Sequence, residues 1–328
     1  MLEAAVASLV ALLWATDREA EVELDGDPLR LDGGRSADLF RVRLCAGPSD
    51  LIDRDLVLRV GPPHRGDLIG GLIQQQAADL GYPTPRVLRI GIDHLSRACS
   101  LMEWADGSSL LDALGPFRAA REAPARLARL MSALHQLDPA SVDVPGDNET
   151  VGVPDVVERA MIDIERRLEA TKPEAWQALL DWLASHRPPS APDVICHGDL
   201  HALNVLAGGH GDLVIDWELS GFGPREFDVA RTKLLFEAVP FAVPATARPI
   251  VQRLGRRASR HFQRSYQAVG SINEEALPWF EALHSARISA LVSADREGSS
   301  EVVEGWRPTL PFLHRRLRRL SGIGLPRV

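Results

Sequence analysis

Polar side chains that can bind a metal ion and orient a hydroxyl group lie in one stretch, residues 194–218, with the sequence VICHGDLHALNVLAGGHGDLVIDWE. If the turn at Gly208–Asp212 closes a hairpin, Asn204 lies across from Asp216 at its open end, and Asp199 lies in the loop that enters this end. Amide and carboxylate oxygens are ligands that suit Mg²⁺, and a further carboxylate beside them can orient or deprotonate a hydroxyl. Phosphoryl transfer from a nucleotide requires these parts, with Asp199 as base or orienting group and Asn204 and Asp216 as metal ligands.

The region before this stretch is rich in strand patterns. Apolar residues alternate with arginines over Phe40–Leu44, and residues 55–60 form a second strand pattern. A short helical pattern then ends at Gly81, which suits the C-terminal cap of a helix. Extended structure resumes after it and ends with the run Cys99–Trp104. These patterns predict an N-terminal lobe built mainly from strands.

Beyond Trp104 the pattern becomes helical. Apolar residues recur at spacings of three and four over residues 127–137, and the segment 156–168 has the same periodicity. Several further helices are expected in the C-terminal hundred or so residues. We therefore predict an α+β chain with a small β-rich lobe, residues 1–103, and a larger, mostly helical lobe, residues 104–328.

Composition excludes several classes of protein. The chain has 328 residues and a net charge of −8, and its three cysteines, Cys45, Cys99 and Cys196, form no disulfide or zinc pattern. The longest apolar stretch, Val6–Ala15, is too short to cross a bilayer. The acidic surplus over residues 146–237 argues against nucleic acid as the main partner. We expect a cytoplasmic protein with neither a membrane nor a nucleic acid as its partner.

The motif HGDLHALN, followed twelve residues later by IDWE, resembles the signature of aminoglycoside phosphotransferases and choline kinase-like enzymes. Those enzymes share the two-lobed protein kinase fold. The resemblance implies an N-terminal nucleotide-binding lobe and a C-terminal lobe for catalysis and acceptor binding. It also implies Mg²⁺-dependent transfer of the γ-phosphoryl group of ATP or GTP to a hydroxyl. The acceptor would be an aminoglycoside, macrolide or nucleoside antibiotic, or a related hydroxylated metabolite.

The same resemblance assigns roles to single residues. His197 would brace the catalytic loop, Trp217 would stand where protein kinases have the phenylalanine of their DFG motif, and Asp228 would buttress the loop. His201 would contact phosphate or substrate, or else make structural hydrogen bonds. Glu218 would face the substrate or cap the hairpin.

Nucleotide contacts are expected from three segments of the first lobe. The loop LDGGRSADLFRV is similar to the family's nucleotide loop, which places Ser36 near the phosphates. The strand LVLRV carries Arg59 where the family has a lysine, and the only two lysines of the chain lie outside this lobe. Arg59 would then bind phosphate oxygens, although the following helix offers no acidic partner for it before Asp79. Backbone groups from Glu103 to Ala105 would hydrogen-bond the purine.

Two other functions fit the residues less well. A metallophosphoesterase could use His197, Asp199 and His201, but such a site needs several more ligands. A catalytically weak nucleotide-binding protein is the other alternative, because Arg59 replaces the lysine. The basic segment Phe312–Leu320 is expected to be a solvated helix face. The sequence leaves open the acceptor, the choice between ATP and GTP, and the oligomeric state.

Overall fold

The computed structural model describes residues 2–15, 21–31, 37–62, 68–144, 154–169, 173–189, 191–209, 211–238, 246–295 and 301–326. The chain forms two compact units. The β-rich unit comprises Met1–Ser108, Ala140–Pro154 and Leu206–Ser220, and the helical unit comprises Ser109–Pro139, Asp155–Val205 and Gly221–Val328. Each unit therefore draws on more than one stretch of sequence. The division into functional lobes at residues 103 and 104 stays a prediction.

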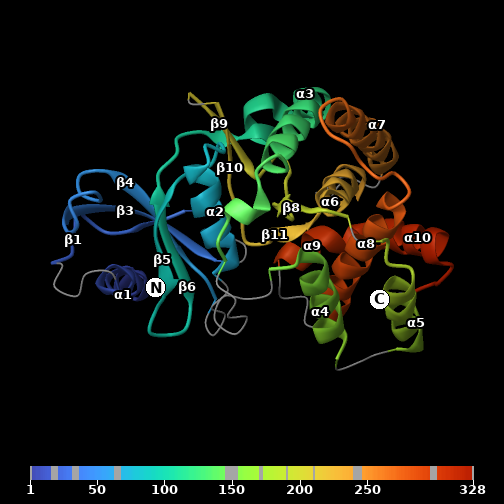
Figure 1. The fold of residues 1–328 in the computed structure, drawn as a ribbon, viewed down its shortest axis with the longest axis horizontal. Coiled ribbons are helices and arrows are strands. Elements are labelled where there is room, and N and C mark those ends of the chain that lie inside the picture. Colours follow the sequence, from blue (N-terminus) through green and yellow to red (C-terminus); the bar gives the residue numbers. More distant parts are fainter. Residues whose placement is uncertain are drawn as a thin grey trace. The chain divides into compact units, whose positions relative to one another are not determined.

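The β-rich unit is built on one antiparallel sheet with the strand order β1-β3-β4-β6-β5, and β2 pairs with β3 (Figure 1). Its strands are β1 (Glu23–Leu24), β2 (Leu29–Arg30), β3 (Asp38–Ala46), β4 (Asp55–Val60), β5 (Val87–Ile92) and β6 (Ala98–Glu103). Side chains alternate between the two faces of a strand. In β4, Leu56, Leu58 and Val60 are buried in the core, and Arg59 therefore faces the opposite side of the sheet.

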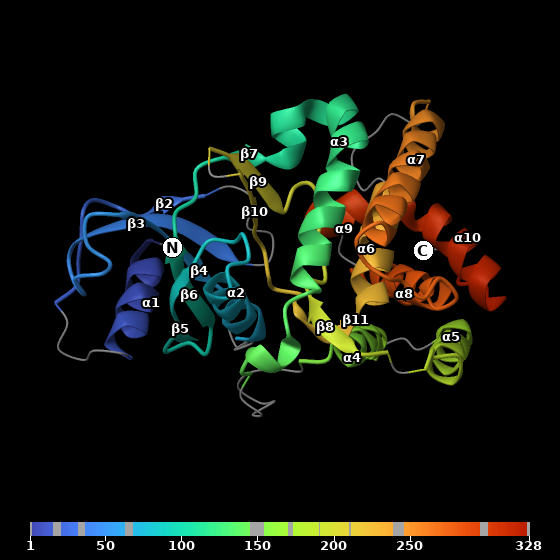
Figure 2. The same cartoon turned by 45° about the horizontal axis from the view of Figure 1, so that its top comes forward.

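Two helices cover this sheet from either side (Figure 2). Helix α1 (Leu2–Trp14) packs Leu9, Leu12 and Leu13 against the buried residues of β3, β4 and β6. Helix α2 (Ile69–Asp79) lies on the side that carries Arg59 and ends before Gly81, whose φ of 85° is left-handed. Glycine adopts this conformation without the steric cost of a Cβ atom, so the expected helix end at Gly81 agrees with the structure.

Short strands frame the stretch that carries the candidate chemistry. Strands β9 (Val205–Gly208) and β10 (Gly211–Val214) are neighbours in a three-stranded sheet with β7 (Ser108–Ser109). Strand β8 (Asp193–Cys196) pairs antiparallel with β11 (Gly221–Pro224), so that Cys196 faces Gly221. The loop that follows β8 therefore starts beside the strand that leads into the next helix.

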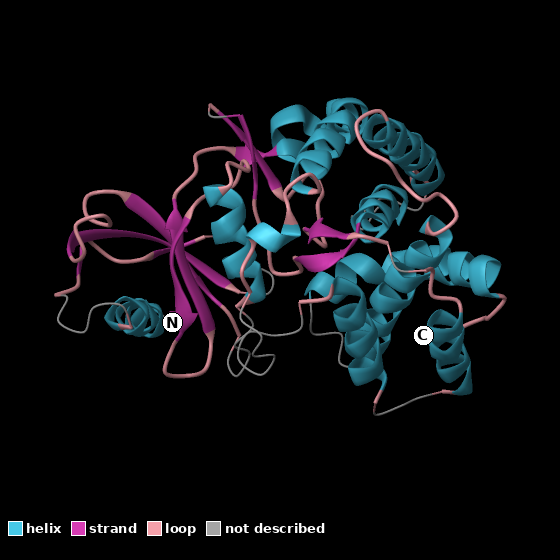
Figure 3. Cartoon of the chain, viewed as in Figure 1, coloured by secondary structure: helices cyan, strands magenta, loops and turns pink. Residues whose placement is uncertain are grey.

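The helical unit consists mostly of helices, as the secondary-structure colours of Figure 3 show. They are α3 (Leu110–Leu134), α4 (Val156–Leu168), α5 (Glu174–Ser185), α6 (Arg225–Ala238), α7 (Arg248–Gln267), α8 (Leu277–Ala294), α9 (Glu301–Trp306) and α10 (Leu310–Ser321), with short 3₁₀ turns at Pro139–Ser141 and Arg307–Thr309. Helix α3 is kinked at Gly115, where φ is 68°, and Pro116 follows. Among the described residues, no helix has the length and apolar character that crossing a bilayer demands.

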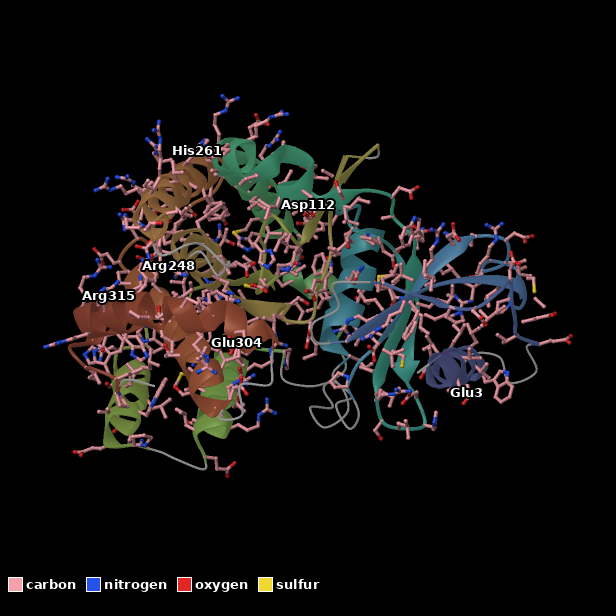
Figure 4. The ribbon with its side chains drawn as sticks, turned by 180° about the vertical axis from the view of Figure 1, so that it is seen from behind. Glu3, Asp112, Arg248, His261, Glu304 and Arg315 are labelled. Carbon is pink, nitrogen blue, oxygen red and sulfur yellow. The ribbon has the colours of Figure 1, made fainter. Side chains whose placement is uncertain are left out.

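Most arginines of helix α10 lie on the surface of the helical unit. Figure 4 shows the side chain of Arg315 pointing outward from α10. Within the predicted solvated face of α10, Arg315, Arg318 and Arg319 are exposed, as expected. The expectation is wrong for Arg316, which is buried and ion-paired with Glu237 and Glu281 from α6 and α8.

Candidate active site

The loop after β8 is held by its own backbone. Gly198 has a φ of 80°, and this left-handed turn directs the N–H groups of His197 and Gly198 toward the same carboxylate, that of Asp228. Both hydrogen bonds are 2.7 Å long, and Asp228 lies buried in the first turn of α6. Successive N–H groups in such a turn form an anion-binding concavity. The backbone conformation of this loop therefore requires a glycine at the second position of the HGD motif.

Asp228 is held from its other side by a buried pair of side chains. His135 Nε2 lies 3.2 Å from the carboxylate, and His135 Nδ1 lies 2.7 Å from the hydroxyl of Tyr266. Burial tends to raise the pKa of Asp228, but the hydrogen bonds and charges of its partners outweigh burial and lower it. His135, Cys196 and Asp228 are close enough to bind a metal ion. However, both oxygens of Asp228 already accept backbone N–H groups, and burial raises the pKa of the Cys196 thiol, so this cluster supports the loop.

Asp199 is paired with an arginine from α6. The Nε and Nη2 atoms of Arg231 both lie 2.9 Å from Asp199 Oδ1, and His201 Nε2 lies 3.6 Å from Oδ2. Burial tends to raise the pKa of this carboxyl, but the Arg231 guanidinium and the His201 ring outweigh burial, so the pKa of Asp199 lies far below its ordinary value. Thr232 donates to the carbonyl of Leu200 at 2.7 Å. Asp199 is therefore an ionised carboxylate in a loop fixed to α6.

The remaining polar residues of the loop fold back on it. Asn204 is buried and donates from Nδ2 to the carbonyl of Asp199 at 3.0 Å. The ring of His197 accepts the N–H of Asp199 at 3.3 Å, and the ring of His201 accepts the N–H of Leu203 at 3.2 Å. The structure thus places His197, Asp199, His201 and Asn204 together in the helical unit. An amide whose nitrogen is occupied in this way presents its oxygen as the remaining ligand atom.

Asp216 and Trp217 are held within the β-rich unit. Asp216 has a φ of 65°, an uncommon conformation for a residue other than glycine. The buried Trp217 donates from Nε1 to Thr84 at 3.0 Å, and Thr84 itself donates to the carbonyl of Val214 at 2.7 Å. Helix α2 approaches so closely that a Cβ atom on Gly70 would lie 2.4 Å from the carbonyl oxygen of Trp217. Contacts on several sides therefore fix the backbone next to Asp216.

Arg59 of β4 has an acidic partner, and this partner does not come from the helix that follows the strand. Its Nη2 atom lies 3.4 Å from Glu218 Oε2, and the two side chains are 22% and 37% exposed. Gln74, on the neighbouring α2, donates instead to the carbonyl of Pro85 at 2.9 Å. The partner that the sequence leaves open thus follows Asp216 by two residues. The structure thus brings Arg59 and Glu218 together. Glu218 was expected to face the substrate or to cap the hairpin, and neither expectation included this ion pair.

The other predicted nucleotide contacts are less defined. Ser36 lies outside the described residues. The backbone N–H of Glu103 donates to the carbonyl of Arg86 at 2.9 Å, and its side chain pairs with Arg54 at 2.6 Å. The N–H and the carboxylate of Glu103 therefore already have partners. Ala105 follows just beyond the end of β6, and its contact with a purine stays a prediction.

Asn204 belongs to the helical unit and Asp216 to the β-rich unit, so the binding of one cation by both residues also stays a prediction. Sequence reasoning missed Arg231, Thr84 and the pair of His135 with Tyr266. Arg231 had a usable signal, because it lies three residues after Asp228 on the same helix, and residues at this spacing share a face.

Residues 29–264 match the family model described as phosphotransferase enzyme family. The chain belongs to this family, and the predicted family is confirmed. Among curated proteins, acyl-CoA dehydrogenase family member 10 of Mus musculus is 28% identical over 230 residues, which cover 63% of this chain and 20% of that protein. The chain thus spans about a fifth of the length of this curated relative.

Solved structures confirm the predicted kinase-like fold. A Ralstonia eutropha protein provisionally assigned as an aminoglycoside phosphotransferase is 18% identical, with a TM-score of 0.62 over 98% of this chain and 99% of that one. A choline/ethanolamine kinase family protein of Mesorhizobium loti is also 18% identical, with a TM-score of 0.58 over 97% and 98% of the two chains. Amicoumacin kinase, in complex with AMP-PNP, Ca²⁺ and Ami, is 13% identical, with a TM-score of 0.61 over 98% and 93%.

Proposed function

We propose that this chain transfers the γ-phosphoryl group of ATP or GTP to a hydroxyl group of a small molecule in the presence of Mg²⁺. The observation that carries this proposal is the ionised Asp199, which Arg231 holds in a loop whose backbone is tied to Asp228. Phosphoryl transfer needs positioning and charge stabilisation more than covalent chemistry from the protein. A fixed carboxylate beside oxygen ligands for a metal meets this need.

Asn204 and Asp216 are our candidates for the metal ligands. Mg²⁺ prefers oxygen ligands and is commonly bound by one or two protein groups, phosphate oxygens and water. The amide nitrogen of Asn204 is used by the carbonyl of Asp199, which leaves its oxygen for a cation, and Asp216 supplies a carboxylate. When bound, Mg²⁺ neutralises charge on the phosphates. The donor set of this chain fits that ion.

Arg59 is our candidate for the phosphate contact in the β-rich unit. A guanidinium binds phosphate oxygens through two parallel N–H groups, which an ammonium does not. The ion pair with Glu218 holds the Arg59 guanidinium on the face of the sheet next to α2. We assign Ser36 to the phosphates as well, and the backbone around Glu103 and Ala105 to the purine.

Asp199 would act on the acceptor more as an orienting group than as a strong base. Its low pKa makes the carboxylate a reluctant proton acceptor in the ground state. A hydroxyl that donates to Asp199 is aligned for attack, and its proton is lost as the new bond to phosphorus forms. His201, beside Oδ2 of Asp199, is placed to contact the acceptor or the transferred phosphate, and His197 braces the loop through the N–H of Asp199.

The acceptor is proposed to be a hydroxylated antibiotic of the aminoglycoside, macrolide or nucleoside type, or a related metabolite. Similarity in fold to amicoumacin kinase supports an antibiotic. If an antibiotic is the acceptor, a cell that expresses this chain tolerates higher concentrations of it. Antibiotic susceptibility of an expressing strain therefore tests this part separately from the chemistry.

The test is nucleotide consumption with a panel of acceptors that includes hygromycin B, erythromycin, choline and homoserine, with ATP and GTP supplied in turn. Asp199→Asn should lower kcat by about 10²- to 10⁴-fold while nucleotide affinity stays nearly unchanged. Asp181→Asn, on the exposed side of α5, is the matched control and should leave turnover intact. Full turnover by the Asp199 variant removes this residue from the chemistry.

A catalytically weak nucleotide-binding protein is the second candidate. The replacement of the family's lysine by Arg59 favours it, because a guanidinium and an ammonium bind phosphate with different geometry. Nucleotide binding without product from any acceptor would support this candidate. A metallophosphoesterase would instead release phosphate from a monoester in the absence of nucleotide. The rings of His197 and His201 already accept backbone N–H groups, which weakens that alternative.

A further inference from the structure

The two oxygens of Asp199 have different surroundings. Oδ1 receives both Nε and Nη2 of Arg231, each at 2.9 Å, whereas the neighbour of Oδ2 is His201 at 3.6 Å. The side chains of Arg231 and Asp199 are 10% and 21% exposed. Two charged donors that converge on one oxygen restrain the position of that oxygen. Oδ1 is therefore committed to Arg231.

Arg231 is itself held in place. Its guanidinium carbon lies 5.6 Å from the ring centroid of Trp306 at the end of α9, and both residues are buried. Stacking on an indole ring attracts a guanidinium and restricts its rotation. The next residue, Thr232, donates to the carbonyl of Leu200. Helix α6 thus fixes both the side chain of Asp199 and the backbone that follows it.

We propose that Arg231 is a positioning residue for phosphoryl transfer, which holds Asp199 Oδ1 so that Oδ2 alone receives the hydroxyl of the acceptor. This inference rests on the proposed function. In the step concerned, the hydroxyl oxygen forms a bond to the γ-phosphorus while the bond between that phosphorus and the β,γ-bridging oxygen breaks. The hydroxyl proton passes to Oδ2, and the nucleoside diphosphate leaves with the electron pair of the broken bond.

A purely structural role for Arg231 makes a different prediction. The chain has a second partly buried ion pair, in which Arg287 of α8 binds Asp163 of α4 at 3.1 Å, with side chains 16% and 9% exposed. Asp163 also pairs with Arg166 and Arg167 of its own helix. That pair joins α4 to α8 and has no part in the proposed chemistry. If Arg231 only stabilised the fold, its loss should resemble the loss of Arg287.

The experiment measures kcat and KM for ATP, with the acceptor found in the panel, or ATP hydrolysis with water as acceptor. Arg231→Met should lower kcat by about 10²-fold, the effect of displacing a reacting group by about 1 Å, while KM for ATP changes less than about threefold. Arg231→Lys keeps the charge without the planar pair of donors and should recover only part of this loss. Arg287→Met should lower the melting temperature and leave kcat unchanged.

A double-mutant cycle separates positioning from stability. When Asp199→Asn is already present, adding Arg231→Met should cost kcat almost nothing, because groups that act as a unit are not additive. Added guanidinium should restore part of the activity of Arg231→Met and none of the activity of Asp199→Asn. If Arg231→Met does not fold, Arg231→Lys takes its place in the cycle.

Two results overturn the positioning role alone: a kcat that depends on Asp199 but stays within twofold in the Arg231 variants, or losses that simply multiply in the double variant. A wild-type chain that consumes no nucleotide with any acceptor overturns the proposed function itself. The two failures are therefore distinguishable in one set of measurements.

Discussion

Helix α2 and the backbone after Asp216 are in such close contact that a single methyl group should separate them. A Cβ atom on Gly70 would lie 2.4 Å from the carbonyl oxygen of Trp217, whereas ordinary contacts begin at 3.4 Å. The obstacle is backbone, held through the hydrogen bonds of Trp217 and its neighbours. Gly70→Ala therefore requires the helix and this segment to move apart by about 1 Å.

The next residue provides a matched control. A Cβ atom on Gly71 would also meet an atom at 2.4 Å, but that atom is the terminal carbon of Ile90, which can rotate away. Both substitutions gain the same helix propensity, about 1 kcal/mol. Overpacking against backbone costs about 1–3 kcal/mol. We therefore expect the free energy of unfolding of Gly70→Ala to lie about 1–3 kcal/mol below that of Gly71→Ala.

The displacement should also be visible at the proposed metal ligand. A shift of about 1 Å at a reacting centre can cost about 10²-fold in rate, and Asp216 adjoins the displaced segment. Gly70→Ala should lower kcat/KM for the Mg²⁺ nucleotide well beyond its loss of stability, and Gly71→Ala should not. Urea denaturation and steady-state kinetics at several Mg²⁺ concentrations measure both effects. Equal stability and equal kinetics of the two variants would refute the reasoning.

Three further substitutions test the remaining assignments. Asp216→Ala should abolish Mg²⁺-dependent nucleotide binding in a calorimetric titration, and an unaltered dependence on Mg²⁺ would contradict its role as a ligand. Arg59→Ala should weaken triphosphate binding about tenfold, the loss of one charged contact, and a change in melting temperature alone would make the pair with Glu218 structural. Burial, with the nearby Arg231 charge, lowers the pKa of His284 from 6.5 to about 3, so the unfolded state binds more protons below pH 6.5. Stability should fall by about 2 kcal/mol between pH 7 and pH 5, and His284→Gln should flatten this slope in urea titrations.

Local patterns predicted the regular elements well. The helical periodicity over residues 156–168 coincides with α4, and the alternation over Phe40–Leu44 lies within β3. In both segments the buried face repeats at the period of the element, so the sequence carries the signal directly. Strand β11 (Gly221–Pro224) was not predicted, because Gly-Phe-Gly-Pro has weak strand propensity and is extended through its pairing with β8.

The predicted site likewise has a part that local sequence predicts and a part that it does not. The HGD loop and its asparagine are read from spacing along the chain, and the structure gathers them in one loop. The partner of Arg59 could not be found by searching α2, because Glu218 lies more than 150 residues away in sequence. The same holds for Thr84, which binds Trp217 across 133 residues. Such contacts depend on how strands and helices are packed, and one sequence does not specify that locally.

Residues on helix α6, outside the HGDLHALN motif, hold the loop that carries this motif in place. Asp228, Arg231 and Thr232 are spaced by three and four residues, which places them on one face of the helix. Each binds a different part of the loop: Asp228 binds the N–H groups of His197 and Gly198, Arg231 binds the carboxylate of Asp199, and Thr232 binds the carbonyl of Leu200. One helix face therefore fixes four consecutive loop residues. Any change in the register of α6 would release them all together.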